Sequence, residues 1–130
     1  MPRATLGNLK RIREFLGKSQ SELGLLLGVS TRAIQSYEQG WRTVPPHVLR
    51  SVAMLLFLNW RKSQTWMAPC WDVRKCGPEK KECCAAWQLR AGDVCWLVNG
   101  TQCGDPEGRD WETKMDHCTK CPVTTRWLSA

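Results

Sequence analysis

Eight cysteines carry the most obvious chemistry in this 130-residue chain, and all of them lie in its second half. Two are followed directly by tryptophan, two are adjacent, and the last two form a Cys-x-x-Cys pair. Deprotonated thiols bind soft metal ions and iron–sulfur clusters, and they also exchange with disulfides. The eight positions are Cys70, Cys76, Cys83, Cys84, Cys95, Cys103, Cys118 and Cys121.

Several kinds of chemistry remain open for these thiols. An iron–sulfur cluster needs four thiolates in a shielded pocket, and the abundant tryptophan and sparse charge near Cys95 suit one. Structural zinc usually shows two Cys-x-x-Cys pairs, whereas this sequence has one, Cys118 with Cys121. A thiol–disulfide switch needs reactive cysteines beside a resolving partner, and inert buried cysteines only pack as small apolar side chains. We favour the iron–sulfur cluster, with zinc as the alternative.

A second group of candidate residues lies in segment 30–40. Helical spacing puts Ala33, Ile34 and Tyr37 on one face of this segment. The opposite face is short and polar, so its side chains can reach base edges in a DNA groove. These polar residues are Thr31, Arg32, Gln35 and Ser36.

Two short helices joined by a tight turn would position this polar face. Ser19 and Glu22 form a capping-box pattern at the start of the first helix. Gly28 lies where that helix must end in a left-handed conformation. Ser30 caps the second helix, and Gly40 ends it. The spacing predicts that the first helix buries an apolar stripe of Leu23, Leu26 and Leu27.

Further helices are predicted on both sides of this pair. An apolar stripe precedes Gly17 and consists of Leu6, Leu9, Ile12 and Leu16. After the Pro45-Pro46 turn, a helix runs to about Arg61 and is apolar on more than one face. One face completes a small helical core. The other must meet a second domain or subunit, unless the helix is fully buried in a single larger core.

Residues from Leu9 to about Leu58 resemble the phage-repressor family of helix-turn-helix domains (Cro/C1, or XRE). The matching features are Arg13 seven residues before Gln20, the S-Q-x-x-L-G run, the G-V-S turn, Ile34 and the Y-E-x-G ending. One departure is Gly24, where the family usually carries alanine. Glycine costs roughly 1 kcal/mol of helix propensity there.

This resemblance implies roles for individual residues. Arg13 and Glu38 would pair across the first and third helices. A contact between Arg32 and a guanine base would be the strongest base contact. Gln20 would bind a DNA phosphate near a helix N-terminus. Arg42 is our candidate for a second phosphate contact. The residues expected to face bases are Thr31, Arg32 and Ser36, with Gln35 as a neighbouring candidate.

The cysteine-rich segment resembles the small two-CW domain of anaerobic and metal-handling bacteria and archaea. The shared pattern is C-W-x4-C, then C-A, then C-W-x3-G-T-x-C, and a terminal C-x-x-C. It accounts for seven cysteines and leaves Cys83 as an extra one. The resemblance does not settle the chemistry of these thiols, and we take the seven motif cysteines as the candidate metal-binding set: Cys70, Cys76, Cys84, Cys95, Cys103, Cys118 and Cys121.

Charge and composition divide the chain in two. Residues 1–62 carry ten Lys/Arg and three Asp/Glu, a net charge of +7, whereas residues 63–130 carry nine of each and are neutral. Residues 66–130 have six tryptophans but only nine Leu, Val and Met, so burial alone stabilises them poorly. We predict a helix-turn-helix domain at 1–62, a linker at 63–69 and a cysteine-rich domain at 70–125.

The expected fold class is an all-α N-terminal bundle of four to five helices, followed by a small, mostly irregular domain that metal holds together. The expected function is a sequence-specific, bacterial or archaeal transcriptional regulator. It would bind double-stranded DNA as a homodimer and use its cysteine module to sense redox state or metal. With no signal peptide and no apolar run long enough to cross a membrane, we expect a cytoplasmic protein.

The alternative is an adaptor or antitoxin-like interaction protein whose cysteine domain is a structural docking module. No enzymatic activity is predicted, since the sequence has neither a phosphate-binding glycine-rich loop nor a nucleophile elbow. The acidic residues of the second half are interpreted as a solvated loop. They are Asp105, Glu107, Asp110 and Glu112.

Overall fold

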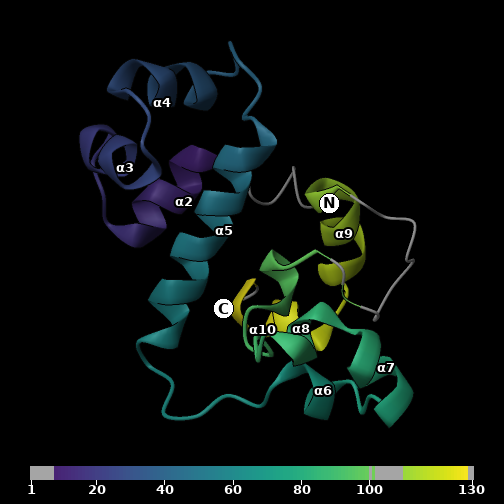
Figure 1. Cartoon of the computed structure of the whole chain (residues 1–130). Coiled ribbons are helices and arrows are strands. Elements are labelled where there is room, and N and C mark those ends of the chain that lie inside the picture. Colours follow the sequence, from purple (N-terminus) through teal and green to yellow (C-terminus); the bar gives the residue numbers. More distant parts are fainter. Residues whose placement is uncertain (1–7, 100, 102–109, 129–130) are drawn as a thin grey trace. The chain divides into compact units, whose positions relative to one another are not determined.

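The computed structural model describes residues 8–99, 101 and 110–128 of the chain (Figure 1). Within these ranges all regular structure is helical, and no strand occurs. The chain divides into two compact units, Met1–Asn59 and Trp60–Ala130. The predicted fold class, a helical N-terminal bundle followed by an irregular cysteine-rich region, is confirmed.

The first unit contains α2 (Leu9–Leu16), α3 (Gln20–Leu27), α4 (Thr31–Glu38) and most of α5 (Pro46–Arg61). The α3–α4 pair is the predicted helix-turn-helix, and α4 packs against both α3 and α2 (Figure 1). None of the helices in the described residues is long and apolar enough to cross a membrane.

Helix ends in this unit follow the local sequence signals. The Ser19 hydroxyl accepts a hydrogen bond from the Glu22 N–H (3.1 Å), and the Glu22 carboxylate accepts one from the Ser19 N–H (3.2 Å). The Ser30 hydroxyl accepts one from the Ala33 N–H (3.0 Å). Gly28 has a φ of 71°, as the predicted left-handed ending of α3 requires. The predicted capping box and turn are confirmed.

The apolar stripe predicted for α3 is only partly correct. Leu23 is fully buried, but Leu26 is 50% exposed and Leu27 is half-buried. The buried residues of α3 are Leu23 and Gly24. Successive residues of a helix are 100° apart around its axis, so Gly24 and Leu26 lie on opposite sides of Leu23. Leu26 therefore does not belong to the buried face of α3.

An ion pair joins α2 to α4, as the resemblance implied. The Arg13 guanidinium donates to Glu38 through Nε and lies 2.9 Å from the same oxygen through Nη2. The other Glu38 oxygen accepts from Gln20 Nε2 (2.6 Å). Because the Glu38 side chain is only 5% exposed, its charge depends on these partners rather than on water.

The second unit consists of short helices and one 3₁₀ turn. They are α6 (Cys70–Val73), α7 (Pro78–Cys83), α8 (Ala85–Gln88), η1 (Cys95–Leu97), α9 (Trp111–Cys118) and α10 (Pro122–Leu128). Segment 63–69 has no regular structure and is attached to α10, since Arg126 Nη1 donates to the Ala68 carbonyl (2.9 Å). The domain borders at 62, 69 and 125 stay a prediction.

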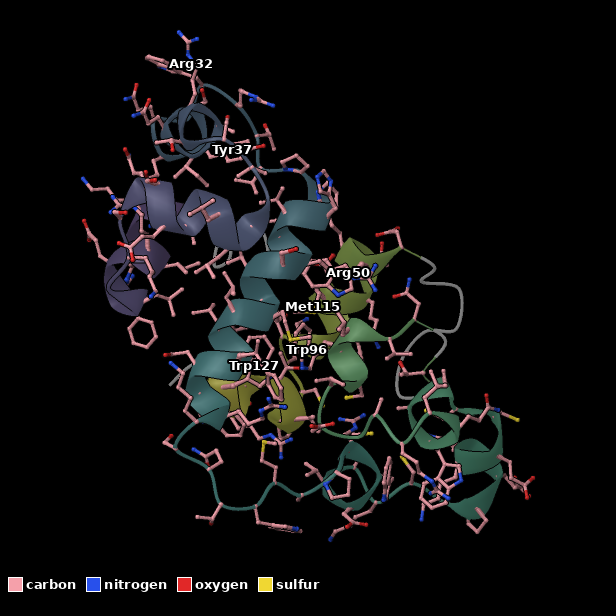
Figure 2. All side chains as sticks on the ribbon, turned by 60° about the vertical axis from the view of Figure 1, so that its left-hand side comes forward. Arg32, Tyr37, Arg50, Trp96, Met115 and Trp127 are labelled. Carbon is pink, nitrogen blue, oxygen red and sulfur yellow. The ribbon has the colours of Figure 1, made fainter. Side chains whose placement is uncertain are left out.

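Aromatic residues form the centre of this unit. Trp96, Met115 and Trp127 are buried and gather inside it (Figure 2). The Trp96 and Trp127 rings lie 4.7 Å apart between centroids. Trp111 is also buried, and its indole N–H donates to the Trp96 carbonyl (3.0 Å). Large indole surfaces thus replace part of the aliphatic core that the composition lacks.

The interpretation of the acidic residues as a solvated loop is only partly correct, since Asp110 is exposed but caps a helix and Glu112 lies inside that helix. Asp110 is the N-cap of α9, and Glu112 lies in its first turn. The Asp110 carboxylate accepts hydrogen bonds from the Thr113 N–H and hydroxyl (both 2.8 Å), which lower the pKa of Asp110. Asp105 and Glu107 lie outside the described residues.

Replacing Glu38 with alanine should destabilise the first unit by about 3–5 kcal/mol, because Arg13 would remain poorly solvated without its carboxylate. Chemical denaturation of the wild-type and variant chains, followed by circular dichroism, measures this change. Glu14→Ala removes an exposed carboxylate from α2 and should change stability by less than about 0.5 kcal/mol. Equal stability of the two variants would contradict a structural role for the pair.

Replacing Gly24 with alanine should also destabilise this unit, although alanine favours helix by about 1 kcal/mol. A Cβ at this position would lie 2.8 Å from the Val29 carbonyl oxygen, a main-chain atom of the turn between α3 and α4. Forced repacking of this kind costs about 1–3 kcal/mol. Denaturation midpoints should fall for Gly24→Ala and stay unchanged for Ser21→Ala, an exposed position on the same helix. A stabilised Gly24→Ala variant would show that the turn relaxes freely.

Candidate functional site

Helix α4 presents the predicted polar face to solvent. Thr31, Arg32 and Gln35 are exposed, and Ser36 is half-buried. Arg32 extends outward from α4, whereas Tyr37 turns inward (Figure 2). Because Ala33, Ile34 and Tyr37 are buried on the opposite face, the orientation of α4 is fixed by its packing. The direct base contacts of these polar residues stay a prediction.

Gln20 belongs to a hydrogen-bond chain that the sequence did not reveal. Its amide N–H donates to Glu38 (2.6 Å), and its carbonyl oxygen accepts from Gln35 Nε2 (3.4 Å). These hydrogen bonds therefore connect the Arg13–Glu38 pair to Gln35, a residue of the polar face. Gln20 is also the first residue of α3, where main-chain N–H groups lack helical partners. Its phosphate contact stays a prediction.

Arg42 follows the end of α4 and is exposed. Its guanidinium lies over the Tyr37 ring, 5.3 Å from the centroid, and its N–H donates to the Ser36 carbonyl (3.4 Å). The aromatic face and the main-chain bond together restrain this cation beside the polar face. Arg42 is thus positioned near Ser36, and its phosphate contact stays a prediction.

In the second unit, one small cavity gathers five of the eight cysteines. Its volume is about 20 Å³, and Arg74, Lys80 and Thr101 also line it. The two cations are exposed, so the cavity has a positively charged side toward solvent. The cysteines that line it are Cys70, Cys76, Cys84, Cys95 and Cys121.

The first cysteines of the two C-W motifs meet at this cavity. The Cys95 thiol is hydrogen-bonded to the Cys70 sulfur, and this bond lowers the pKa of Cys70 to about 7. Burial opposes the shift, while the Trp71 N–H and the charge of Lys114 add to it. Lys114 is held nearby by its hydrogen bond to the Thr101 hydroxyl (2.6 Å). The arrangement favours a thiolate at Cys70.

Other members of the predicted metal-binding set lie elsewhere. Cys118 is buried but does not line the cavity, although Cys121 three residues later does. Cys103 lies outside the described residues. Among the residues that the structure describes, no three His, Cys, Asp or Glu side chains are already close enough to share one ion. The structure thus brings the thiols to one cavity without closing them around a common point.

Gly92 holds the two C-W motifs together and was missed by the sequence analysis. Its carbonyl accepts a hydrogen bond from the Cys70 N–H (2.8 Å). A Cβ on Gly92 would lie 2.6 Å from Pro69 Cβ and 2.8 Å from a ring carbon of Trp71. Only a residue without a side chain permits this approach. The spacing A-G-D-V-C-W contains the glycine but does not show what it packs against.

Gly92→Ala should push the Cys70 segment away from the Cys95 segment and destabilise the second unit by about 1–3 kcal/mol. Thermal unfolding followed by tryptophan fluorescence reports on this unit, which holds seven of the eight tryptophans. The control is Gly77→Ala, because no atom lies within 4 Å of a Cβ there and φ is an ordinary −73°. The prediction fails if both variants unfold at the wild-type temperature.

Comparison with known proteins identifies the first unit. Residues 9–61 match a helix-turn-helix family model, over the same stretch as α2 to α5. Among curated proteins and solved structures, no match to the chain was found. The resemblance to the two-CW domain stays a prediction. The match supports a DNA-binding regulator that carries a Cro/C1-type helix-turn-helix domain at residues 9–61.

Proposed function

We propose that this protein is a sequence-specific transcriptional regulator, that it binds DNA as a homodimer, and that a thiolate-bound metal in its cysteine module controls this binding. The observation that carries the proposal is the exposed polar face of α4 within a matched helix-turn-helix domain. This face is oriented by the buried residues of α4 and by the Arg13–Glu38–Gln20 contacts behind it.

Base recognition is assigned to α4. Arg32 has the reach and the paired donors to bind the O6 and N7 atoms of guanine, a contact worth about 1–3 kcal/mol of discrimination. Thr31, Gln35 and Ser36 supply shorter hydrogen-bonding groups on the same face. Gln20 and Arg42 bind phosphates on either side, and the +7 charge of residues 1–62 attracts the DNA backbone.

Two copies are proposed on each operator. One recognition helix contacts only a few base pairs, so a single domain gives little sequence selectivity. A two-fold symmetric dimer doubles the contacts and binds an inverted repeat with half-sites about one helical turn apart.

The cysteine module is proposed as the metal-dependent part. Five thiols line one cavity, and thiolates are the donors that soft metals and iron–sulfur clusters prefer. Two cations beside them would offset the negative charge of the thiolates. A bound metal would supply structural cross-links between segments of the second unit. Metal loss would then loosen this unit and lower operator affinity without altering the polar face of α4.

DNA binding should fall steeply with salt, by about 0.9 log unit in affinity per log unit of salt for each phosphate neutralised. Arg32→Ala should relax the preference at one base pair, whereas Arg42→Ala should weaken all sequences alike and reduce the salt slope by about 1. Fluorescence anisotropy with operator variants, selected from a random library, measures both effects.

A charge-matched control is Lys62→Ala, which removes an exposed cation beyond the end of α5. It should leave the base preference intact. Affinity that stays flat between about 50 and about 200 mM salt would contradict the DNA-binding proposal. It would instead favour the docking role of an adaptor.

A further inference from the structure

We infer that Gln20 is a positioning residue for Gln35, and that the side-chain amide of Gln35, held in this way, recognises an adenine base in the major groove. The inference rests on the proposed binding of DNA by α4. It adds to that proposal the base that Gln35 recognises and the residue that orients Gln35 toward it.

The carboxylate of Glu38 fixes the orientation of the Gln20 amide. One oxygen of Glu38 pairs with Arg13 (2.9 Å), and the other accepts from Gln20 Nε2 (2.6 Å). An ionised carboxylate has no hydrogen to donate, so it must face the NH₂ group of Gln20. The carbonyl oxygen of Gln20 is thereby turned away from Glu38. The two ends of this amide cannot exchange places without breaking a short, charge-assisted hydrogen bond.

Gln35 takes its orientation from Gln20 in the same way. Its Nε2 donates to the Gln20 carbonyl oxygen, 3.4 Å away. A carbonyl oxygen only accepts, so the NH₂ group of Gln35 must face it. This hydrogen bond is long and exposed in the free protein, and it gains strength where a DNA surface excludes water from the polar face. The direction of the whole hydrogen-bond chain is therefore set by Glu38.

The groups that remain on Gln35 are those that adenine requires. One of its two amide N–H groups is used by Gln20, which leaves its carbonyl oxygen and one N–H. In the major groove, adenine presents N6–H as a donor and N7 as an acceptor, and a glutamine amide pairs with both. No other single base presents a donor and an acceptor together there. Gln35 is exposed and lies three residues after Arg32 on the same face of α4, so it can reach a base edge.

The phosphate contact proposed for Gln20 is compatible with this role. Its side chain uses one amide N–H and the carbonyl oxygen in the hydrogen-bond chain. The second amide N–H, and the main-chain N–H at the start of α3, can still bind a phosphate. Loss of the Gln20 amide should therefore lower both the overall affinity for DNA and the preference for adenine.

The experiment measures base preferences by fluorescence anisotropy with the full-length protein. The probes are a duplex operator selected from a random library and variants in which each base pair is replaced in turn by the other three. We expect one position of the half-site to prefer adenine by about 5- to 150-fold, and Gln35→Ala to remove this preference. Gln20→Met keeps the length of the side chain without its amide and should reduce the preference by about 2- to 12-fold.

A matched control is Gln39→Met, since Gln39 is exposed at the C-terminal end of α4 and does not belong to the polar face. It should leave every base preference unchanged. Gln20→Met should also have no effect on the adenine preference when Gln35 is already alanine, because Gln20 acts on that base only through Gln35. The ratio of two affinities measured on one protein sample does not depend on the fraction that is folded, so a loss of stability in Gln20→Met would not alter these comparisons.

Different failures separate this inference from the proposed function. Base preferences that depend on Arg32 but not on Gln35, or a Gln35-dependent preference for another base, would overturn the inference and leave DNA binding intact. A Gln20→Met variant that weakens all sequences alike and keeps the adenine preference would do the same, since Gln20 would then act only on the phosphates or on the fold. A full-length protein that selects no sequence from the library would overturn both.

Discussion

The carboxylate of Glu38 is the contact on which the first unit depends most. It lies at the end of α4, accepts from Arg13 of α2 and from Gln20 of α3, and is almost excluded from water. A buried charge with three donors tolerates few other arrangements of its partners. The same side chain that fixes the packing of three helices therefore also fixes the direction in which α4 presents Arg32 and Gln35.

Local signals in the sequence were sufficient to place the helix ends of the first unit. Helix caps act over three or four residues, so Ser19, Glu22, Gly28 and Ser30 could be placed without knowledge of the fold. The face of α3 that is buried could not be placed in this way. A stripe of three leucines fits two orientations of a helix, and the close approach of Gly24 to the following turn decides between them.

The second unit was harder to predict because its contacts connect distant segments. Short helices such as α6 and α8 have less than two turns and carry almost no periodic signal. The C-x-x-C pair suggested that Cys118 and Cys121 act together, yet only Cys121 reaches the cavity. The role of Gly92 likewise depends on Pro69 and Trp71, more than 20 residues earlier.

The distribution of the cavity cysteines has a consequence for chain entropy. The segment between Cys70 and Cys121 makes up most of the second unit, and sulfurs near both of its ends reach one cavity. Joining distant points of a chain restricts its unfolded ensemble, and the restriction grows slowly with the length of the loop that is closed. A link at this cavity would close one long loop and shorter loops within it. Only a link that persists in the unfolded chain, as a disulfide does, would stabilise the fold by restricting that chain, whereas a metal ion held by the folded unit alone stabilises it by its binding free energy.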